Sequence, residues 1–123
     1  MKFSRSAEDY LEAIYMAEMD GRAAQVTGIA EMLRVRPPSV TEAVRKLSEK
    51  GLAEYEKYGA VRLTSAGRRH AKDVYDKHRL LREFFMKIGV RDSTANKDAC
   101  MAEHVLSRET LERMKDFVKG GKR

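Results

Sequence analysis

Six residues whose side chains can bind divalent metals fall into three groups along the sequence. Two carboxylates come first, three residues apart, so a helix would place both on one face. A thiol, a carboxylate and an imidazole come last, at i, i+3 and i+4, and a single imidazole lies between these groups. This mixture of ligands suits a divalent first-row transition metal. The six residues are Asp9, Glu12, His78, Cys100, Glu103 and His104.

Each group also has an ordinary structural explanation. Ser6 and Asp9 resemble a capping box, in which the acid would only stabilise the start of a helix. The other carboxylates and the imidazoles fit solvated surfaces or structural positions. Cys100, the single cysteine, is a buried hydrophobe, a metal ligand or a reactive thiol. The metal hypothesis therefore depends on the occurrence of all three groups in one short chain.

The distribution of charge suggests a second kind of chemistry. The chain has a formal net charge of +6, and residues 34–69 contain nine Lys or Arg but only four Asp or Glu. A local basic excess of this kind favours contacts with nucleic-acid phosphates, although a solvated basic face has the same composition. With 42% hydrophobic and 36% charged residues, the chain is expected to fold rather than to be disordered.

Apolar spacing and terminal signals predict the elements that must position these residues. The expected helices run from Ser6 to Asp20–Gly21, from the N-cap Thr27 to about Leu33, from Pro37 to Gly51, from the cap Ser65 to Gly89, from Asp92 or Ser93 to about Leu106, and from the cap Ser107 to a frayed end at Gly120–Gly121. The expected strands cover residues 52–57 and 61–64, with a turn at Tyr58–Gly59.

This order predicts a mainly α protein that begins with a winged helix-turn-helix and a two-stranded β wing. In that fold the N-terminal part of the second helix of the pair enters the major groove. Small hydroxyl groups there can approach base edges, a proline can contact a thymine methyl, and basic residues can contact phosphates. The expected DNA-binding residues are Arg36, Pro38, Ser39, Thr41, Glu42, Arg45 and Lys46 in the helical pair, with Lys57 and Arg62 in the wing.

The sequence resembles the diphtheria toxin repressor and manganese transport regulator family of metal-dependent transcriptional repressors. The matching stretches are Ser6–Tyr15, Ile29–Leu33, Pro38–Thr41, Leu63–Gly67, Lys77–Leu81 and Ala99–Ser107, of which the last is the most specific. The resemblance implies a winged helix-turn-helix domain at residues 1–70 and an α-helical metal-binding and dimerisation domain at residues 71–123. It also implies a metal site between the first and fifth helices, built from the six residues above. Base-reading roles are implied for Pro38, Ser39, Thr41 and Glu42.

Compared with this family, the residues form a hybrid. The carboxylate of Asp9 resembles the manganese-type branch, whereas the thiol of Cys100 resembles the iron-type branch. Arg82 stands where an acid is usual in the iron-type ancillary site, and Asn96 stands where a histidine can occur. A cation at Arg82 should weaken metal binding nearby. The expected cofactor is a divalent transition metal, Fe(II) or Mn(II), and the ligands do not decide between them.

The expected function is repression of metal-homeostasis genes by a homodimer that binds double-stranded operator DNA when loaded with metal. Metal ligands from both halves of the chain would fix the recognition helices at the spacing of half-sites about one helical turn apart. One alternative is a winged-helix regulator switched by Cys100 oxidation or by an organic ligand, and another is a dimerising adaptor, which the basic segment opposes. An enzyme is not expected, because no glycine loop or oxyanion element accompanies the Cys100–His104 pair, so no residue is assigned a catalytic role.

The sequence also predicts where the protein acts. No apolar run approaches the roughly 18 residues that a membrane span needs. The first residues, Met1 to Ser6, lack the apolar stretch of a signal peptide. We therefore expect a cytoplasmic protein without a membrane partner.

Overall fold

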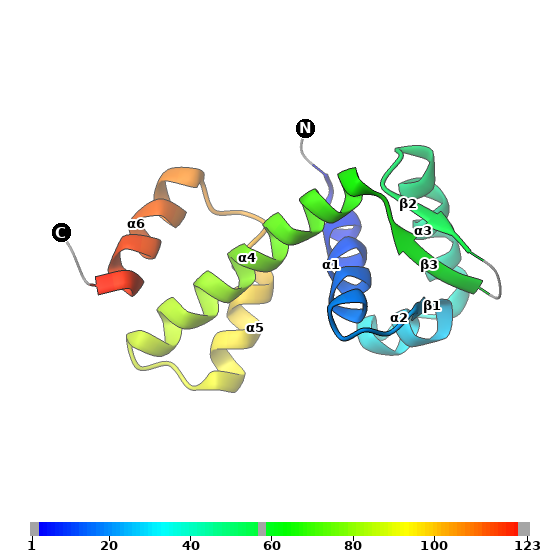
Figure 1. Cartoon of the computed structure of the whole chain (residues 1–123). Coiled ribbons are helices and arrows are strands. Elements are labelled where there is room, and N and C mark those ends of the chain that lie inside the picture. Colours follow the sequence, from blue (N-terminus) through cyan, green and yellow to red (C-terminus); the bar gives the residue numbers. More distant parts are fainter. Residues whose placement is uncertain (1–2, 57–58, 121–123) are drawn as a thin grey trace. The chain divides into compact units, whose positions relative to one another are not determined.

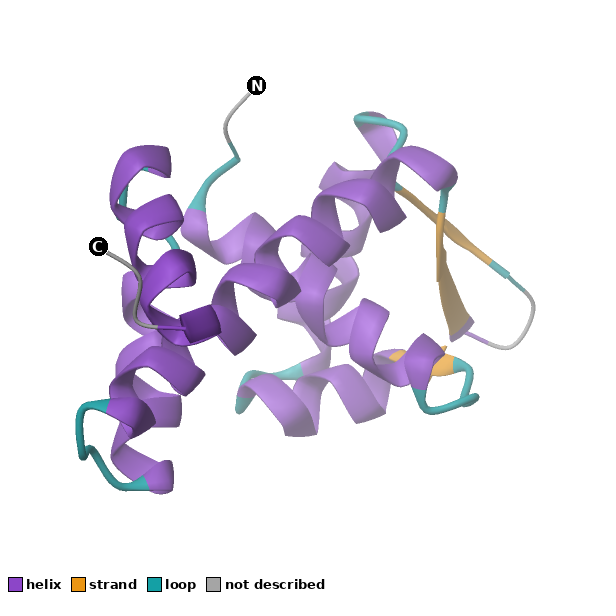
Figure 2. Ribbon diagram, turned by 60° about the vertical axis from the view of Figure 1, so that its left-hand side comes forward, coloured by secondary structure: helices purple, strands orange, loops and turns teal. Residues whose placement is uncertain are grey.

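The structure, a computed structural model, describes residues 3–56 and 59–120 and divides into two compact units. The N-terminal unit is Met1–Lys72 and the C-terminal unit is Asp73–Arg123. Figures 1 and 2 show the course of the chain and its helices and strands. The elements are α1 (Arg5–Met19), β1 (Ala24–Gln25), α2 (Val26–Leu33), α3 (Pro37–Glu49), β2 (Ala53–Tyr55), β3 (Ala60–Leu63), α4 (Ser65–Lys87), α5 (Asp92–Ala102) and α6 (Arg108–Gly120).

Helix α1 begins earlier than its sequence pattern predicts. The hydroxyl of Ser4 accepts a hydrogen bond from the Ala7 amide at 3.1 Å, so Ser4 and not Ser6 is the N-cap. The expectation for Ser6 was wrong because Ser4 satisfies an otherwise unpaired amide of the first turn two residues upstream. One face of α1 is buried in the core of the N-terminal unit, with Leu11 and Ile14 completely inaccessible to solvent.

Helices α2 and α3 form the predicted helix-turn-helix. Arg34 ends α2 in the left-handed conformation, with φ 58°, and the next amide, that of Val35, donates to the Ala30 carbonyl at 3.0 Å. A residue with a Cβ costs about 1–2 kcal/mol in this conformation, so the tight turn is held by the packing of the helices around it. Helix α2 starts at Val26 with Gln25 as its N-cap, so the expected cap Thr27 lies inside the helix.

The wing is part of a small antiparallel sheet with the strand order β1-β3-β2. Ala53 pairs with Leu63 and Tyr55 with Val61, as a hairpin requires. Strand β1 adds Ala24 opposite Val61, so the sheet has three strands and not only the two of the expected ribbon. Two residues are too few to show an alternating pattern, and β1 forms because β3 offers it a partner edge. Lys57, at the end of an expected strand, and Tyr58, in the expected turn, lie outside the described residues.

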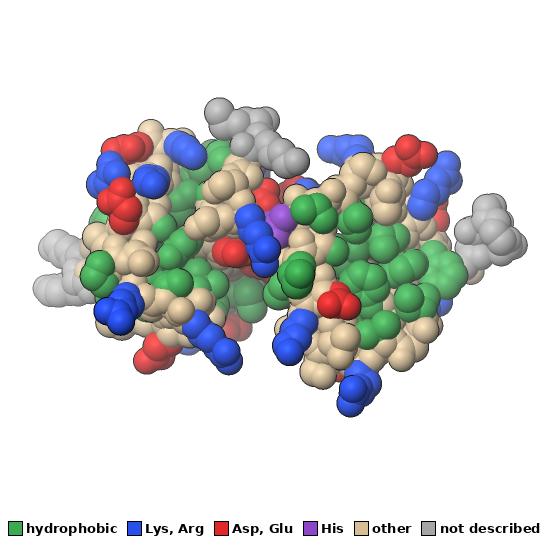
Figure 3. Space-filling model, turned by 180° about the vertical axis from the view of Figure 1, so that it is seen from behind, with side chains coloured by type: hydrophobic (Ala, Val, Ile, Leu, Met, Phe, Trp, Pro, Cys, Tyr) green, Lys and Arg blue, Asp and Glu red, His purple; other side chains and the backbone are tan. Residues whose placement is uncertain are grey.

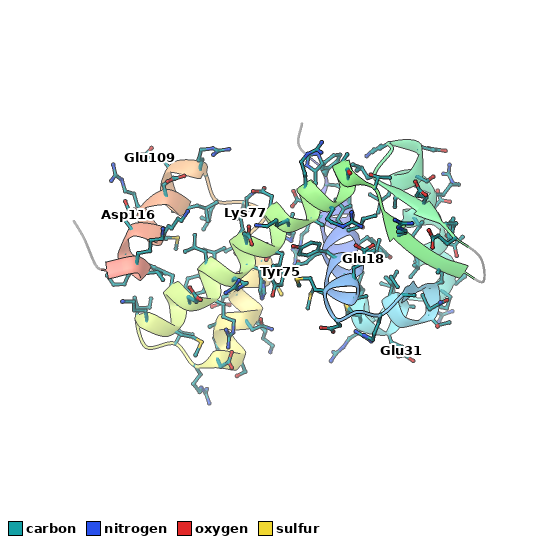
Figure 4. The ribbon with its side chains drawn as sticks, in the orientation of Figure 1. Glu18, Glu31, Tyr75, Lys77, Glu109 and Asp116 are labelled. Carbon is teal, nitrogen blue, oxygen red and sulfur yellow. The ribbon has the colours of Figure 1, made fainter. Side chains whose placement is uncertain are left out.

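Polar contacts fasten the wing to the helices beside it. Glu18 of α1 accepts the Leu63 amide of β3 at 3.0 Å and also binds the Arg68 guanidinium of α4, at 2.9 and 3.1 Å. Figure 4 labels Glu18 on α1 in the N-terminal unit. Thr64, and not the expected Ser65, caps α4, because its hydroxyl accepts the Gly67 amide at 3.0 Å and donates to the Gly51 carbonyl at 2.7 Å.

The C-terminal unit contains the remaining part of α4, then α5 and α6. Alanines at positions 95 and 99 are fully buried, so α5 packs through small side chains. Helix α5 ends at Ala102, four residues before the expected end, and Glu103 is its C-cap. Ser107 caps α6 as predicted, accepting the Thr110 amide at 3.2 Å. Among the described residues, no helix is long and apolar enough to span a membrane.

The mainly α architecture, with a winged helix-turn-helix followed by a helical part, is therefore confirmed. The core of the N-terminal unit holds α3 through Val40, Val44 and Leu47, all buried. The opposite face of α3 is left exposed to solvent. In the C-terminal unit, the end of α5 lies beside α4, where His78 contacts Asn96 and Glu103. These two arrangements position the candidate DNA-reading and metal-binding residues.

Candidate metal centre and DNA-reading surface

The C-terminal unit brings together an imidazole of α4 and the acidic and imidazole groups that follow α5. His78 Nδ1 lies 2.9 Å from Glu103 Oε1, and His104 Nε2 lies 3.4 Å from Glu103 Oε2. All three side chains are largely shielded from solvent, with exposed fractions of 13% for His78, 4% for His104 and 1% for Glu103. Glu103 and His104 follow the last residue of α5, where a turn takes the place of the predicted helix.

Hydrogen bonds keep His78 protonated. Its contacts with Cys100 and Glu103, assisted by Asn96 and opposed by burial, raise the pKa of His78 to about 11. The protonated ring donates from Nδ1 to Glu103 and from Nε2 to Asn96 Oδ1, at 2.7 Å. Because Asn96 holds Nε2, the nitrogen that faces Glu103 is the one available to a cation once the ring loses a proton.

One oxygen of Glu103 is buried without a hydrogen-bond partner among the described residues. This oxygen is Oε2, and His104 Nε2 lies at ion-pair distance from it. A buried carboxylate oxygen normally has a partner, because leaving it unpaired costs about 1–3 kcal/mol or more. A divalent cation would satisfy this oxygen, and the imidazole and carboxylate groups around it are suitable ligands.

Cys100 belongs to the same neighbourhood. It lies on α5 and is exposed, which contradicts the alternative of a thiol packed in the core. Its hydrogen bond with the His78 ring is the largest of the influences that raise the pKa of that ring. The C-terminal unit thus brings together four of the six predicted ligands, His78, Cys100, Glu103 and His104.

The other two predicted ligands lie on α1 in the N-terminal unit. Asp9 and Glu12 are one helical turn apart and both are partly buried. Because Ser4 is the N-cap, Asp9 lies in the second turn of α1 and is not the capping acid that the Ser6 pattern suggested. Both carboxylates therefore share a face of one helix, as their spacing predicts.

Arg82 and Asn96, the two departures from the iron-type pattern, both have partners in the structure. Arg82 Nε donates to Asp92 at the start of α5 at 2.8 Å, and this bond lowers the pKa of Asp92. The Arg82 charge is therefore partly compensated within the C-terminal unit. Sequence reasoning noted Asn96 as a departure but missed its contact with His78, which depends on how α4 and α5 pack.

The expected DNA-reading residues lie on the exposed face of α3 and on the wing. Arg36 is the N-cap of α3, and residues 37–42 after it are exposed apart from the buried Val40. The exposed set comprises Pro38, Ser39, Thr41 and Glu42, followed by Arg45 and Lys46. In the wing, Arg62 is exposed on β3, while Lys57 lies outside the described residues.

Two of these basic residues are paired with acids. Arg45 binds Glu42 through Nε and Nη2, at 3.1 and 2.6 Å, and binds Glu49 through Nη1. Arg62 donates to Glu56 at 3.0 Å across the wing. Sequence reasoning missed Glu49 and Glu56 as partners, although the i, i+4 spacing of Arg45 and Glu49 was a usable signal.

Comparison with known families agrees with this arrangement. Residues 2–61 match the iron dependent repressor N-terminal DNA binding domain. Residues 64–123 match the iron dependent repressor metal binding and dimerisation domain. An uncharacterised HTH-type transcriptional regulator of Methanocaldococcus jannaschii is 39% identical over 117 residues, which cover 94% of each chain. The HTH-type transcriptional regulator MntR of Bacillus subtilis is 41% identical over 113 residues, covering 92% of this chain and 80% of MntR.

Solved structures show the same likeness. A manganese-dependent transcriptional repressor in complex with manganese aligns with a TM-score of 0.84 and 32% identity, over 95% of this chain and 54% of that one. The manganese regulator SloR aligns with a TM-score of 0.81 and 32% identity, over 92% of this chain and 53% of that one. The chain thus spans about half the length of these two solved proteins. It belongs to the iron dependent repressor family, which includes the diphtheria toxin repressor and the manganese transport regulators.

Proposed function

We propose that this protein is a repressor that binds operator DNA as a homodimer when it is loaded with Fe(II) or Mn(II), and that it controls metal-homeostasis genes. The observation that carries the proposal is the buried Glu103 oxygen without a hydrogen-bond partner among the described residues, beside two imidazoles. A buried carboxylate that keeps one oxygen without a hydrogen-bond partner, next to metal-binding groups, is more readily explained by cation binding than by a contribution to folding.

The proposed ligands come from both units. Within the C-terminal unit these are His78 through Nδ1, the thiolate of Cys100, the carboxylate of Glu103 and His104. Asp9 and Glu12 of α1 complete the set as a proposal based on their spacing and on the family. When bound, the ion would supply positive charge to Glu103 and join ligands of the two units. Before binding, His78 must lose the proton that its neighbours stabilise, so metal uptake releases a proton.

The coupling to DNA follows from where the ligands lie in the chain. Asp9 and Glu12 belong to the helix that packs on α2 and α3, while the other four belong to the C-terminal unit. Ligation by both units would favour one relative orientation of the units over others, which shifts the population toward the DNA-binding state. By reciprocity, operator DNA would raise the affinity for metal by the same factor.

Dimerisation is proposed through the C-terminal unit. This unit leaves apolar side chains exposed, among them Ile88 at 55% and Phe117 at 38%, and no residue of α6 is buried in the described part of the chain. In Figure 3 hydrophobic side chains gather over the right-hand half, which is this unit. A two-fold dimer would present two α3 helices to half-sites about one helical turn apart.

The test is DNA binding with and without metal. We would measure fluorescence anisotropy of duplexes from upstream of candidate metal-transport genes at fixed salt, with chelator, Mn(II), anaerobic Fe(II) or Zn(II). Tight binding only with metal is the expected result, and the order of the ions would identify the one that is sensed. Glu103→Gln should lose the metal response, while Asp98→Asn on the exposed part of α5 is the matched control and should keep it.

The same assay distinguishes metal activation from the alternative, a switch through Cys100 oxidation or an organic ligand. Equal binding with chelator and with metal would contradict metal activation and favour a switch through the exposed Cys100 or an organic ligand. In that case Cys100→Ser should remove the response to a mild oxidant. Metal activation would also be contradicted if Glu103→Gln and wild type responded to Mn(II) alike.

A further inference from the structure

The ridge of α3 opposite the core carries two acids and one base. Glu42, Arg45 and Glu49 follow one another at spacings of three and four residues and so line one side of the helix. Val40, Val44 and Leu47 occupy the other side and are buried. All three members of the ridge are about half exposed, with side-chain fractions of 52%, 52% and 62%. This ridge therefore lies on the exposed side of α3, opposite its buried face.

Two carboxylates on the exposed side of a recognition helix need a physical explanation. A recognition helix enters a groove between two rows of phosphates, and carboxylates there are repelled. The surrounding segment is otherwise basic, which makes the acidic ridge a local exception. A favourable contact with a base edge would explain why a carboxylate is placed at this position.

Arg45 holds the Glu42 carboxylate in one orientation. Its Nε and Nη2 bind the two oxygens of Glu42, at 3.1 and 2.6 Å, and its Nη1 binds Glu49. A forked contact of this kind fixes both the position and the plane of the carboxylate. The hydrogen bonds from Arg45 also lower the pKa of Glu42, so Glu42 is ionised at neutral pH and acts only as a hydrogen-bond acceptor.

Building on the proposed function, we propose that Glu42 determines specificity by accepting a hydrogen bond from the N4 amino group of a cytosine in the major groove, with Arg45 as its positioning residue. Glu42 lies in the second turn of α3, within the N-terminal part of the helix that contacts base edges in this fold. Glu49 is the last residue of α3 and lies outside this N-terminal part of the helix.

The donor and acceptor pattern of the bases favours cytosine over the other three. Guanine presents N7 and O6 acceptors, and thymine presents O4 and a methyl group, so neither offers a donor to an ionised carboxylate. Adenine offers its N6 amino group beside the N7 acceptor, a pair that an amide side chain matches and a carboxylate does not. Cytosine offers the N4 donor without that neighbouring acceptor.

The experiment is selection from a pool of randomised duplexes, followed by sequencing, with wild type, Glu42→Gln, Arg45→Met and Glu49→Gln. Each protein is tested with Mn(II) and with chelator, at two salt concentrations. The two metal conditions separate the test of metal activation from the test of base preference. Equal binding with Mn(II) and with chelator would contradict the proposed metal activation. The base preference of Glu42 could still be determined from the selected sequences in that case.

The expected wild-type result is a preference for cytosine of roughly tenfold at one position in each half-site. Glu42→Gln should shift that position toward adenine, while binding random DNA more tightly because a negative charge is gone. Arg45→Met should weaken the cytosine preference without changing the preferred base. Glu49→Gln, the matched control, should keep the wild-type preference.

Three results would overturn the proposal. The first is a wild-type selection without cytosine at any position, or an unchanged profile for Glu42→Gln. The second is an equal shift for Glu49→Gln, which would assign the effect to the charge of the ridge and not to a base contact. The third is an unchanged profile for Arg45→Met together with a smaller salt dependence, which would make Arg45 a phosphate contact.

Discussion

Replacing Gly67 by alanine should destabilise the protein, although alanine is the better helix former. Gly67 lies buried in the first turn of α4, where the helix leaves the wing. A Cβ built on it would lie 1.9 Å from the Leu52 carbonyl oxygen, about 1.5 Å closer than the 3.4 Å at which ordinary contact begins. The backbone fixes the position of the Cβ, and the Leu52 oxygen belongs to the backbone, so rotation of a side chain cannot relieve the contact.

The size of the effect follows from two opposing contributions. Alanine in place of glycine stabilises a helix by about 1 kcal/mol. Against this, forcing an extra methyl group into a packed site costs about 1–3 kcal/mol, and occasionally more. Moving Leu52 would also strain its carbonyl's hydrogen bond from the Thr64 amide, now 3.1 Å, which contributes about 1 kcal/mol. We expect a net loss of about 1–3 kcal/mol, and a loss of about 2 kcal/mol corresponds to roughly 10 °C in Tm.

Gly28 is the matched control on α2. It is exposed, and a Cβ there would meet nothing within 4 Å among the described residues. Gly28→Ala should therefore raise stability by about 0.5–1 kcal/mol. Calorimetry and urea unfolding of the two variants beside wild type would measure both changes. If Gly67→Ala were as stable as wild type, or if both variants changed in the same direction, the close approach of α4 to Leu52 would be wrong.

Three further predictions concern single side chains. Glu18→Gln should lower the free energy of unfolding by about 1–2 kcal/mol, because the charged acceptor of the Leu63 amide and of Arg68 is lost. Glu31→Gln on the exposed part of α2 is the control and should change the free energy of unfolding little. Urea unfolding would measure both variants, and equal effects would contradict the role of Glu18. The pKa of His78, about 11 in the folded protein against an ordinary value of 6.5, means that its contribution to stability without metal is fully present below about pH 6.5 and is lost as the pH rises toward 11. Unfolding of metal-free wild type and His78→Gln between about pH 6 and 9 would test this, since the variant should lose that pH dependence, while Mn(II) affinity of wild type should rise with pH. Asn96→Ala should weaken Mn(II) binding by roughly 10- to 100-fold, because the contact that orients His78 is lost. Competition with a fluorescent chelator would measure the Mn(II) affinity. An unchanged affinity would refute the role of Asn96 in orienting His78.

The candidate metal centre shows what spacing can and cannot predict. The i, i+3, i+4 pattern of Cys100, Glu103 and His104 brings the three residues to one end of α5 whether or not the last two are helical, because a turn continues the same path of the chain. The spacing pattern does not predict that Asn96 contacts His78. Asn96 reaches that ring only because α4 and α5 pack side by side, an arrangement that depends on buried residues along both helices.

Some helix termini could likewise be predicted from the sequence, and others could not. Pro37 and Pro38 open α3 as predicted, because proline fixes a backbone angle that suits a first turn whatever surrounds it. The caps Ser4 and Thr64 were not predicted, because Ser6, two residues after Ser4, and Ser65, directly after Thr64, are equally good candidates by sequence. The choice between neighbours is made by the packing that sets where the chain turns.

The sequence by itself determined the order of helices and wing, the exposed and buried sides of α3, and the family, because each depends on periodicity or on side-chain types at short spacing. The tertiary structure decided the third strand, the close approach at Gly67, the orphaned oxygen of Glu103 and the proton on His78. Each of these depends on groups far apart in the chain that folding brings together, and on the burial that makes an unpaired oxygen or a buried charge costly.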